Sequence, residues 1–450
     1  MVRKKKFVLS TTQIILLSFL VTILVGSGLL ALPISSASGE AVPYLDALFT
    51  ATTSACVTGL VTLPTVSTWS IFGQIVILIL IQIGGLGLIT IMSGLMILLN
   101  KKMGLGDRLL IQDAFNLNTM SGLAKFVKNV LLGTLIIEGI AAILYMLVFV
   151  PEFGVSGIWI SIFNSVSAFC NAGIDIIAEN SLCNYATNPL INLVTSGLII
   201  LGGLGYIVWW DVIRVFKRRS PRKFSHLTLH SKIALTVTAG LIFAGAVFIF
   251  IFEYDNPSTI GDLSFFDKIQ VSFFQSITTR TAGFASVPQE NLTNASAAIS
   301  ILLMLIGGSP VGTAGGMKTV TIAVLVCSAF ATIRNKNGAT LFGRRISEGS
   351  IKKAVAVVVM FITICAASMI LLMATNDFSV IDAAYETVSA TATVGLSRNL
   401  TATLDIFGKL IIIATMYFGR VGPISLAVAF GSKNESQNVI SEPTEEISIG

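Results

Sequence analysis

Long apolar runs alternate along the chain with two kinds of connecting segment. Eight runs reach the length of about 20 residues that a helix needs to cross a bilayer: 12–32, 72–99, 127–150, 190–212, 233–252, 297–330, 354–375 and 407–430. A long, half-polar segment follows the first, third, fifth and seventh runs, and a short, basic stretch follows the second, fourth and sixth. The pattern predicts eight transmembrane helices in four pairs.

The half-polar segments resemble one another, which indicates a fourfold repeat. Each ends in a glycine that is followed by a large apolar residue, and the glycines are Gly59, Gly173, Gly283 and Gly395. Their spacings are 114, 110 and 112 residues. An aromatic residue lies ten positions before each glycine: Phe49, Phe163, Phe273 and Tyr385. The predicted repeats are residues 1–100, 101–218, 219–337 and 338–431, followed by a cytoplasmic tail, 432–450.

A second glycine motif recurs 24 to 29 residues after each of these glycines. The four motifs are Gly84-Gly85-Leu86-Gly87, Gly202-Gly203-Leu204-Gly205, Gly307-Gly308-Ser309-Pro310 and Gly419-Arg420-Val421-Gly422. Glycines in membrane helices often serve close helix packing, but the shared register favours a bend or constriction. In the third repeat, proline and further glycines predict that the helix breaks at Gly307 and resumes near Thr319.

Each half-polar segment has the composition of a re-entrant pore loop. About a dozen helix-compatible residues give roughly 18 Å of helix, half of a bilayer. The C-terminal end of such a half-helix carries a partial negative charge, which suits a cation. A glycine there lets backbone carbonyls point inward. The sequence therefore predicts an all-α integral membrane protein in which four helix–pore-loop–helix repeats surround one pore, as in potassium channels.

Composition excludes the main alternatives to a membrane protein. Hydrophobic residues make up 54% of the 450 positions and charged residues 12%, whereas a soluble domain has about 25% charged residues. Disordered chains are poor in apolar residues. The first apolar run exceeds the ~7–15 residues of a signal peptide core, so we interpret it as a retained helix. We expect the five cysteines to be free thiols.

The charge distribution predicts orientation. Lys and Arg, 29 in all against 23 acids, concentrate at the N-terminus and in the stretches between repeats. By the positive-inside rule these regions face the cytoplasm, with both termini. The half-polar segments then face outward, and their many acidic residues should attract cations. Nucleic-acid binding is not expected from this surplus.

Motifs in these segments resemble the Trk/Ktr/HKT superfamily of potassium uptake proteins, and most of all the bacterial Ktr membrane subunit. The strings that carry the resemblance are Cys56-Val57-Thr58-Gly59, Cys170-Asn171-Ala172-Gly173, Arg280-Thr281-Ala282-Gly283 and Ala392-Thr393-Val394-Gly395, with IQIGGLG at 81–87, GGSPVGTAGGMKT at 307–319 and FGRVGP at 418–423. The similarity runs from residue 12 to about 431. None of the strings is the TVGYG of tetrameric potassium channels.

The resemblance implies potassium uptake through a channel-like pore in the bacterial plasma membrane. The four strings above would form the filter, and K⁺ would be held by their carbonyls. Gly307, Gly308, Ser309, Pro310, Val311, Gly312, Thr313, Ala314, Gly315, Gly316 and Arg420 would form a gate. The family implies a homodimer in contact with membrane lipid, with a cytoplasmic nucleotide-binding regulatory ring as partner. Nucleotide would bind that ring and not this chain, and sodium dependence stays open.

For several residues, and for the function itself, the sequence allows two interpretations. Arg280 either supports the filter or points outward into solvent. Glu138, in a predicted span, either pairs with a neighbouring helix or coordinates a coupling ion. The GxGD sequence at 104–107 lacks a partner Asp in a span, and Lys318 lacks the spacing of a phosphate-binding loop. No catalytic motif suggests an enzyme. A secondary transporter of another small cation or solute remains the alternative function.

Overall fold

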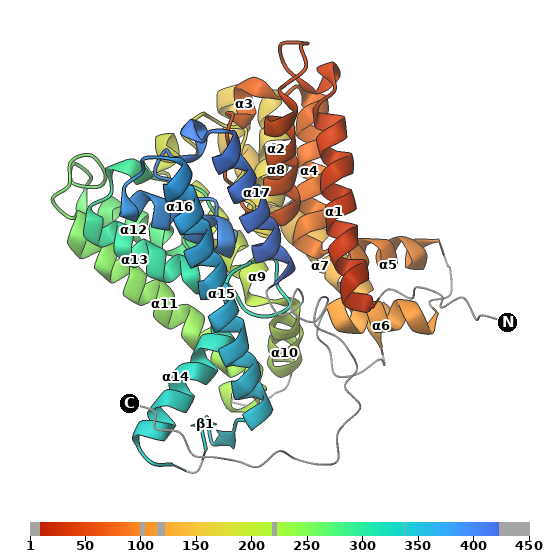
Figure 1. Ribbon diagram of the computed structural model, residues 1–450, viewed down its shortest axis with the longest axis vertical. Coiled ribbons are helices and arrows are strands. Elements are labelled where there is room, and N and C mark those ends of the chain that lie inside the picture. Colours follow the sequence, from red (N-terminus) through yellow and green to blue (C-terminus); the bar gives the residue numbers. More distant parts are fainter. Residues whose placement is uncertain (1–9, 100–103, 115–121, 218–222, 337, 423–450) are drawn as a thin grey trace.

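The structure is a computed structural model that describes residues 10–99, 104–114, 122–217, 223–336 and 338–422. Nearly all of the regular secondary structure in the described chain is helical, which confirms the predicted all-α class (Figure 1). The exceptions are the hairpin strands β1 (Thr340–Leu341) and β2 (Arg344–Arg345). The predicted tail, 432–450, lies outside the described residues.

Four long outer helices open the four repeats: α1 (Thr11–Leu30), α7 (Leu123–Phe153), α11 (Leu229–Glu253) and α15 (Glu348–Thr375). Each is long and apolar enough to cross a membrane by itself. Hydroxyl side chains cap three of them at the N-terminus: Ser10 for α1, Thr228 for α11 and Ser347 for α15. At most a third of the apolar window of each helix is buried, so most of its surface is available to lipid.

Four short pore helices follow the outer helices: α2 (Tyr44–Cys56), α8 (Ser156–Cys170), α12 (Phe265–Thr278) and α16 (Val380–Ala392). They contain 13, 15, 14 and 13 residues. These lengths confirm the prediction of about a dozen helical residues before each filter string, enough to reach about half-way through a bilayer.

The inner helices close the repeats: α4 (Ile71–Leu86) with α5 (Leu88–Leu98), α9 (Pro189–Leu204) with α10 (Tyr206–Phe216), α13 (Asn294–Leu305) with α14 (Thr319–Ile333), and α17 (Ile406–Val421). The first two pairs bend by 96° and 98°. The bends fall at Gly87 and Gly205, whose φ angles of +83° and +84° favour glycine. The predicted bend is confirmed in these two repeats. In the fourth repeat α17 continues through Gly419 to Val421, and the rest of the run 407–430 lies outside the described residues. The runs 72–99, 190–212 and 297–330 are not continuous helices.

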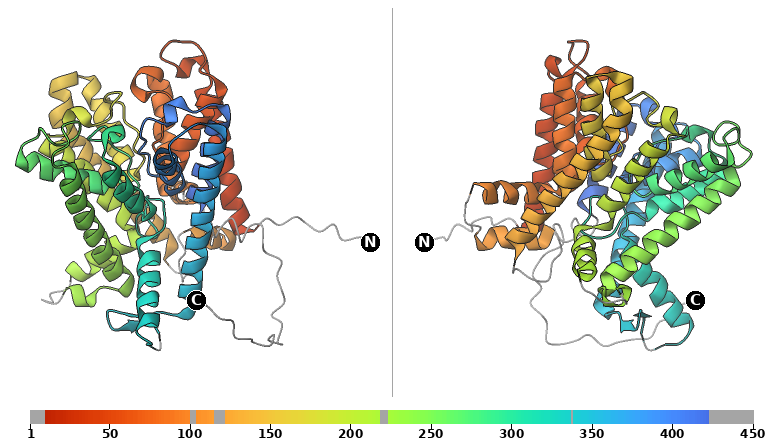
Figure 2. Two further views of the ribbon diagram at one scale, coloured as in Figure 1. Left: turned by 60° about the vertical axis from the view of Figure 1, so that its left-hand side comes forward. Right: turned by 180° about the vertical axis from the view of Figure 1, so that it is seen from behind.

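The remaining short elements connect these helices at the two ends of the bundle. They are α3 (Thr65–Thr68), α6 (Leu105–Ala114) and the 3-10 helices Pro33–Ser35, Cys183–Tyr185, Phe224–His226, Gln289–Asn291 and Thr401–Thr403. Figure 2 shows α14 and the β-hairpin projecting from the bundle at one end.

The repeats are arranged in a closed ring. The inner helix of each repeat packs against the pore helix of the next: α4 on α8, α9 on α12, α13 on α16 and α17 on α2. The last contact joins the fourth repeat to the first. An ion pair crosses the same junction, because Lys409 Nζ on α17 lies 2.6 Å from Asp46 Oδ1 on α2. Segments from all four repeats thus meet around one axis.

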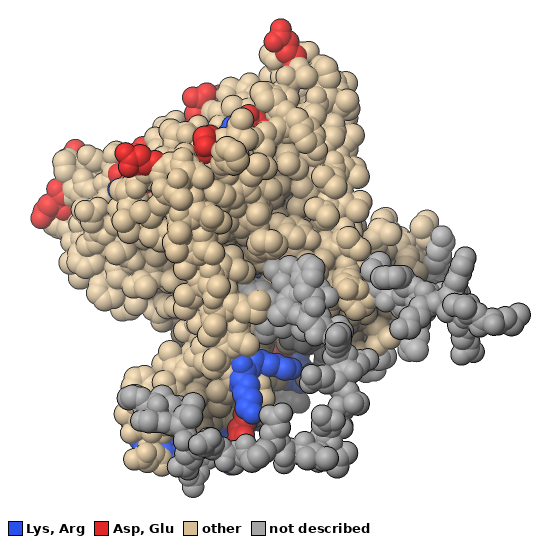
Figure 3. Space-filling view, viewed as in Figure 1, with Lys and Arg blue, Asp and Glu red and all other residues tan. Residues whose placement is uncertain are grey.

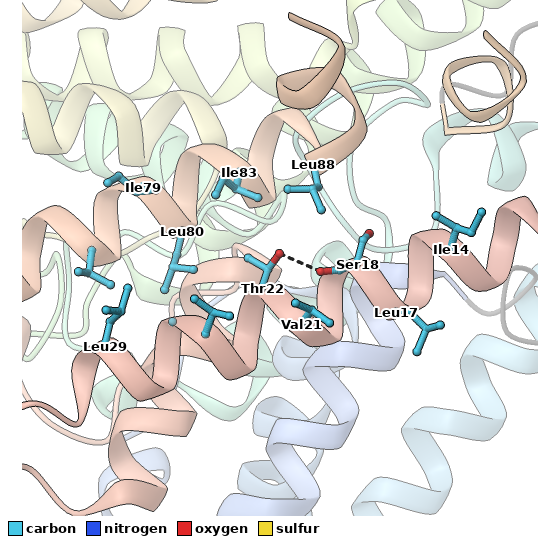
Figure 4. Close-up of a pocket in the computed structure, with 13 residues that line it drawn as sticks. Ile14, Leu17, Ser18, Val21, Thr22, Leu29, Ile79, Leu80, Ile83 and Leu88 are labelled. Atoms are coloured by element: carbon cyan, nitrogen blue, oxygen red, sulfur yellow. Dashed lines mark hydrogen bonds between the residues drawn. The ribbon is translucent and has the colours of Figure 1, made fainter. Parts of the chain in front are cut away.

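The outer surface between α1 and α4 forms an apolar groove of about 600 Å³ (Figure 4). Two hydroxyls lie in it, and each donates to a carbonyl of its own helix: Ser18 to Ile15 and Thr22 to Ser18. The groove therefore presents hydrocarbon alone, which suits contact with lipid chains.

Charged side chains separate toward the two ends of the molecule. In Figure 3 most of the acidic side chains in view gather along the upper edge, over the loops between outer and inner helices, and the most prominent Lys and Arg side chains lie at the lower end, next to an acidic one. We call these the acidic end and the basic end. The pore helices begin near the acidic end, and α14 and the hairpin lie at the basic end.

Candidate ion pathway

The glycines of the four predicted filter strings meet in a ring. A Cβ atom added to Gly59 would lie 2.6 Å from the carbonyl oxygen of Ala172, and one on Gly173 would lie 2.5 Å from that of Ala282. The same relation joins Gly283 to Val394, at 2.5 Å, and Gly395 to Thr58. Each glycine thus faces the carbonyl that precedes the next repeat's glycine. We call the oxygens of Thr58, Ala172, Ala282 and Val394 the carbonyl ring.

In each repeat, the chain between the pore helix and the carbonyl ring passes through one residue with a left-handed backbone conformation. Val57, Asn171, Thr281 and Thr393 have φ angles of 56°, 60°, 62° and 52°. In repeats one, two and four the left-handed residue directly follows the pore helix and turns the chain toward the axis. There the first residue of the predicted filter string (Cys56, Cys170 or Ala392) is the buried last residue of the pore helix. In the third repeat α12 already ends at Thr278, and the buried Arg280 lies between the helix and Thr281.

Hydroxyls on the pore helices fasten the extended segments. The amide of Gly59 donates to Thr53 Oγ1 at 2.9 Å, and that of Gly395 donates to Ser389 Oγ at 3.0 Å. In the other two repeats the hydroxyl is the donor, from Ser167 to the Ile174 carbonyl and from Thr278 to the Phe284 carbonyl. Sequence reasoning missed these residues, although a hydroxyl recurs six positions before three of the glycines.

The third segment is one residue shorter than the others. The amide before the glycine donates to the residue five positions back in repeats one, two and four, but the Ala282 amide donates to Thr278, four back. The aromatic register shifts accordingly. Phe274 is buried like its counterparts Phe49, Phe163 and Tyr385, whereas Phe273 is 37% exposed. The predicted equivalence of Phe273 with the other three aromatics is therefore wrong, because the third segment has one residue fewer between Thr278, to which it is bonded, and its glycine.

No described residue donates a hydrogen bond to the carbonyl ring. Several polar side chains beside the ring likewise have no partner within the described chain: the hydroxyls of Thr58, Thr281 and Thr393 and the amide of Asn171. The ring is thus a set of oxygen ligands without charge, the arrangement that can replace the hydration shell of a cation.

A loop from the third repeat lies against the ring on the side of the basic end. It runs from Ile306 to Lys318, between α13 and α14, and confirms the predicted break. Its two stems pair through the Gly307 amide and the Met317 carbonyl, at 2.9 Å. A Cβ on Gly315 would lie 2.7 Å from the Ala392 carbonyl and would also collide with the Thr393 hydroxyl. The loop therefore contacts the fourth segment directly.

The middle of the loop is bonded to the bend of the second repeat. The Ser309 amide donates to the Gly203 carbonyl at 2.8 Å, and the Tyr206 amide donates to the Val311 carbonyl at 2.9 Å. The Thr313 hydroxyl also reaches the Phe169 carbonyl at the end of α8, at 3.1 Å. These bonds occupy backbone groups that the helix break would otherwise leave unpaired.

Arg420, at the end of α17, joins three repeats. Its Nη1 donates to the Thr313 carbonyl of the loop at 2.6 Å, and its Nη2 donates to the Gly84 carbonyl of α4. The sequence placed Arg420 at the depth of the loop, and the structure confirms that contact. The bond to the first repeat was not predicted.

Arg280 points into the protein. It is 6% exposed, and its Nη2 donates to the Gly307 carbonyl at 3.1 Å and to the Thr238 hydroxyl at 3.3 Å. The outward, solvated alternative is therefore excluded. Arg280 links the third segment of the ring to the first residue of the predicted gate.

A cavity of about 470 Å³ lies below the loop. Residues of all four repeats line it, including Gly84, Tyr206, Lys318 and Arg420. Along the axis the structure therefore places the carbonyl ring, the loop and then this cavity.

Two buried carboxylates lie close to the pathway. Glu138 on α7 accepts from Gln82 Nε2 on α4 at 3.3 Å, so it contacts a neighbouring helix. Asp175, two residues beyond Gly173, accepts from the Ser181 hydroxyl at 2.6 Å. Burial raises the pKa of Asp175 to about 6, and hydrogen bonds from Ser181 and the backbone oppose that shift. The sequence placed Asp175 only among the acidic residues of the half-polar segments, which should attract cations, and it assigned no role to Gln82.

Residues 4–442 match the TrkH family, described as a cation transport protein. The potassium/sodium uptake protein NtpJ of Enterococcus hirae is 38% identical over 455 residues, which cover 100% of this chain and 98% of that protein. The Ktr system potassium uptake protein B of Bacillus subtilis is 39% identical, covering 97% of this chain and 96% of that protein.

The fold is similar to the crystal structure of the potassium transporter TrkH from Vibrio parahaemolyticus. The TM-score is 0.76 at 16% identity, and the similarity covers 95% of this chain and 86% of that chain. With a family match over nearly its whole length, the chain belongs to the TrkH family of cation transport proteins and is a multi-pass membrane protein.

Proposed function

We propose that the protein takes up potassium through the axis that the four repeats enclose. The observation that carries the proposal is the ring of glycines in which each faces the next repeat's carbonyl. Such packing leaves no room for a side chain and brings four carbonyl oxygens together. Oxygens held in this way can replace the water around a monovalent cation.

Related proteins support potassium as the ion. The relatives from Enterococcus hirae and Bacillus subtilis are named as potassium/sodium and potassium uptake proteins, at 38% and 39% identity over nearly the full chain. A sodium contribution is consistent with the first of these names.

Charge supports an orientation with the acidic end outside and both termini in the cytoplasm. The most prominent group of described Lys and Arg side chains in view lies at the basic end (Figure 3), as the positive-inside rule requires of a cytoplasmic face. Acidic side chains at the opposite end would raise the local concentration of cations at the entrance. The setting is the plasma membrane of a bacterium.

The loop and Arg420 support a gate below the filter. The loop touches the fourth segment at Gly315, and Arg420 holds Thr313 to Gly84 across the axis. A guanidinium in that place opposes a cation descending from the ring. Movement of α14, which projects toward the basic end, would draw the loop aside.

A cytoplasmic partner would supply that movement. The chain is similar to proteins named as potassium uptake protein B of a Ktr system, and its basic end presents α14 and the hairpin (Figure 2). We expect a nucleotide-binding ring to dock there and a homodimer of this chain to sit on it. Full nucleotide-dependent gating by the purified chain alone would contradict the need for a ring.

The test of function is uptake of potassium or radiolabelled rubidium by cells that lack their own potassium import. Expression of the chain with its partner should restore growth at low potassium and accumulate rubidium. Failure of both, with the protein present in the membrane, would contradict the proposal. The alternative is secondary transport of another small cation or solute. In that case the cells would take up this other substrate, and added potassium would not inhibit its uptake.

A further inference from the structure

The three cationic side chains around the loop share an unusual set of partners. Arg280, Arg420 and Lys318 all donate to backbone carbonyls: Gly307 for Arg280, Thr313 and Gly84 for Arg420, and Ala314 and Gly315 for Lys318. None takes part in the ion pairs found among the described residues, which are Arg214–Asp211, Arg398–Asp382 and Lys409–Asp46. The protein's own cations thus occupy the oxygens that lie just below the carbonyl ring.

Lys318 differs from the two arginines in its position. It belongs to the third repeat's own loop, at the N-cap of α14, and its side chain folds back so that Nζ lies 2.7 Å from the Ala314 oxygen and 3.4 Å from the Gly315 oxygen. Lys318 also lines the 470 Å³ cavity. A lysine ammonium is a compact point charge on a flexible stem, unlike a planar guanidinium.

The oxygens that Lys318 contacts belong to the part of the loop that touches the fourth predicted filter segment. Gly315 packs against Thr393 and the Ala392 carbonyl so closely that a Cβ there would collide with both. The two oxygens belong to Gly315 and to the residue before it, Ala314. Oxygens so arranged attract any small monovalent cation, and the ammonium group is one.

We propose that the Ala314 and Gly315 carbonyls are a monovalent-cation site of the pore that the ammonium of Lys318 fills in this state. The loop side of this pair is fixed to the filter and to the second repeat, whereas Lys318 starts the helix that extends to the basic end. Withdrawal of α14 would remove the tethered ammonium and free the oxygens for the transported ion. This inference rests on the proposed function of the axis as a potassium path.

The first test is transport by the purified chain in liposomes without its partner. Lys318→Ala should raise rubidium uptake about tenfold, since a unit charge a few ångströms from the ion's path is removed. Butylammonium, added on the basic side, should enter the vacated space and return uptake toward the wild-type rate. Lys318→Arg keeps the charge and should stay near wild type, and Lys352→Ala, an exposed lysine on α15, should change nothing.

The second test is direct occupancy. Thallium(I) should give anomalous density beside the Ala314 and Gly315 oxygens in crystals of Lys318→Ala and none there in the wild type. If Lys318→Ala does not fold, Lys318→Met keeps the stem and should show raised uptake that butylammonium does not inhibit. Raised uptake of Lys318→Ala without amine inhibition and without thallium density would overturn the site and leave Lys318 as a simple charge barrier.

The two proposals fail in different ways. Wild-type protein with its partner that carries no rubidium would contradict potassium uptake itself, whatever the variants do. If the wild-type protein carries rubidium but the Lys318→Ala variant neither gains flux nor binds thallium, only the proposal that the Lys318 ammonium fills a cation site is contradicted.

Discussion

Two layers of backbone carbonyls lie along the axis, and they differ in what they are bonded to. In the carbonyl ring, four repeats contribute one equivalent oxygen each, and no described donor engages them. In the layer below, oxygens of the loop and of Gly84 accept from Arg280, Arg420 and Lys318. The same chemical group is thus left open for an ion in one layer and closed by the protein's own charge in the other.

The inner-helix glycines show how the third repeat came to differ. A Cβ on Gly84, Gly202 or Gly419 would collide with the carbonyl of Ala55, Phe169 or Thr391, each four residues before its filter glycine. The equivalent Gly307 meets the Gly315 carbonyl of its own loop instead. Three repeats therefore use the glycine to bring an inner helix onto a pore helix, and the third uses it to fold a loop. Fourfold repetition builds the ring, and one departure from it builds the loop layer.

The largest effect should come from filling the ring. Gly59→Ser places a Cβ 2.6 Å from the Ala172 carbonyl at a φ of +101°, where side chains are strained. We expect potassium uptake to fall about a hundredfold, at roughly 1.4 kcal/mol per tenfold, and the preference for potassium over sodium to weaken. Gly240→Ser is the control, because no atom lies within 4 Å of a Cβ there. Unchanged potassium affinity and an unchanged K⁺/Na⁺ ratio would show that the ring does not select.

A smaller effect of opposite sign should come from opening the loop layer. Arg420→Ala, or a deletion within residues 311–315, removes the bridge between Thr313 and Gly84 and should raise partner-independent flux about tenfold. The K⁺/Na⁺ ratio should persist, since the ring is untouched. Arg334→Ala, on an exposed arginine at the end of α14, is the matched control. If both variants insert normally and their flux is at or below that of the wild type, the loop is not a gate and only interrupts the packing of the third inner helix.

The affinity for potassium at the carbonyl ring should depend on pH through Asp175, which lies two residues beyond Gly173. Burial raises its pKa to about 6, so the carboxyl takes up its proton at a higher pH than a free aspartate does. Its negative charge is therefore lost as pH falls through 6. The apparent affinity for external potassium should then fall by up to about fivefold between pH 7 and 5, because a nearby charge stops attracting the ion. Asp175→Asn should show the weaker affinity at both pH values. An equal pH response in wild type and variant would assign the effect to another group.

The smallest effect should come from the junction that closes the ring between the fourth and first repeats. Lys409 and Asp46 form a partly buried ion pair at 2.6 Å. In a double-mutant cycle of Lys409→Met and Asp46→Asn, thermal unfolding in detergent should give a coupling free energy of about 0.5–1 kcal/mol. Coupling of zero would mean that helix packing alone closes the ring. Gly59→Ser effects on selectivity should not depend on this pair.

Features that depend on local chemistry could be predicted from the sequence. The lengths of the pore helices, the bends at Gly87 and Gly205 and the break between Leu305 and Thr319 follow from apolar run length and from the conformational limits of glycine and proline. The fourfold register of the filter glycines followed from spacing alone. These features need no knowledge of which segments become neighbours.

The tertiary structure decided what those segments face. Phe274, and not Phe273, is the buried aromatic because the third segment is one residue shorter between Thr278 and its glycine. Arg280 turned inward to the Gly307 carbonyl, and Lys318 folded back on its own loop. Each glycine meets a carbonyl about 110 residues away in the sequence, or at the other end of the chain for Gly395. Contacts of this kind arise only when four repeats close into a ring, and no local pattern encodes the partner that closure brings.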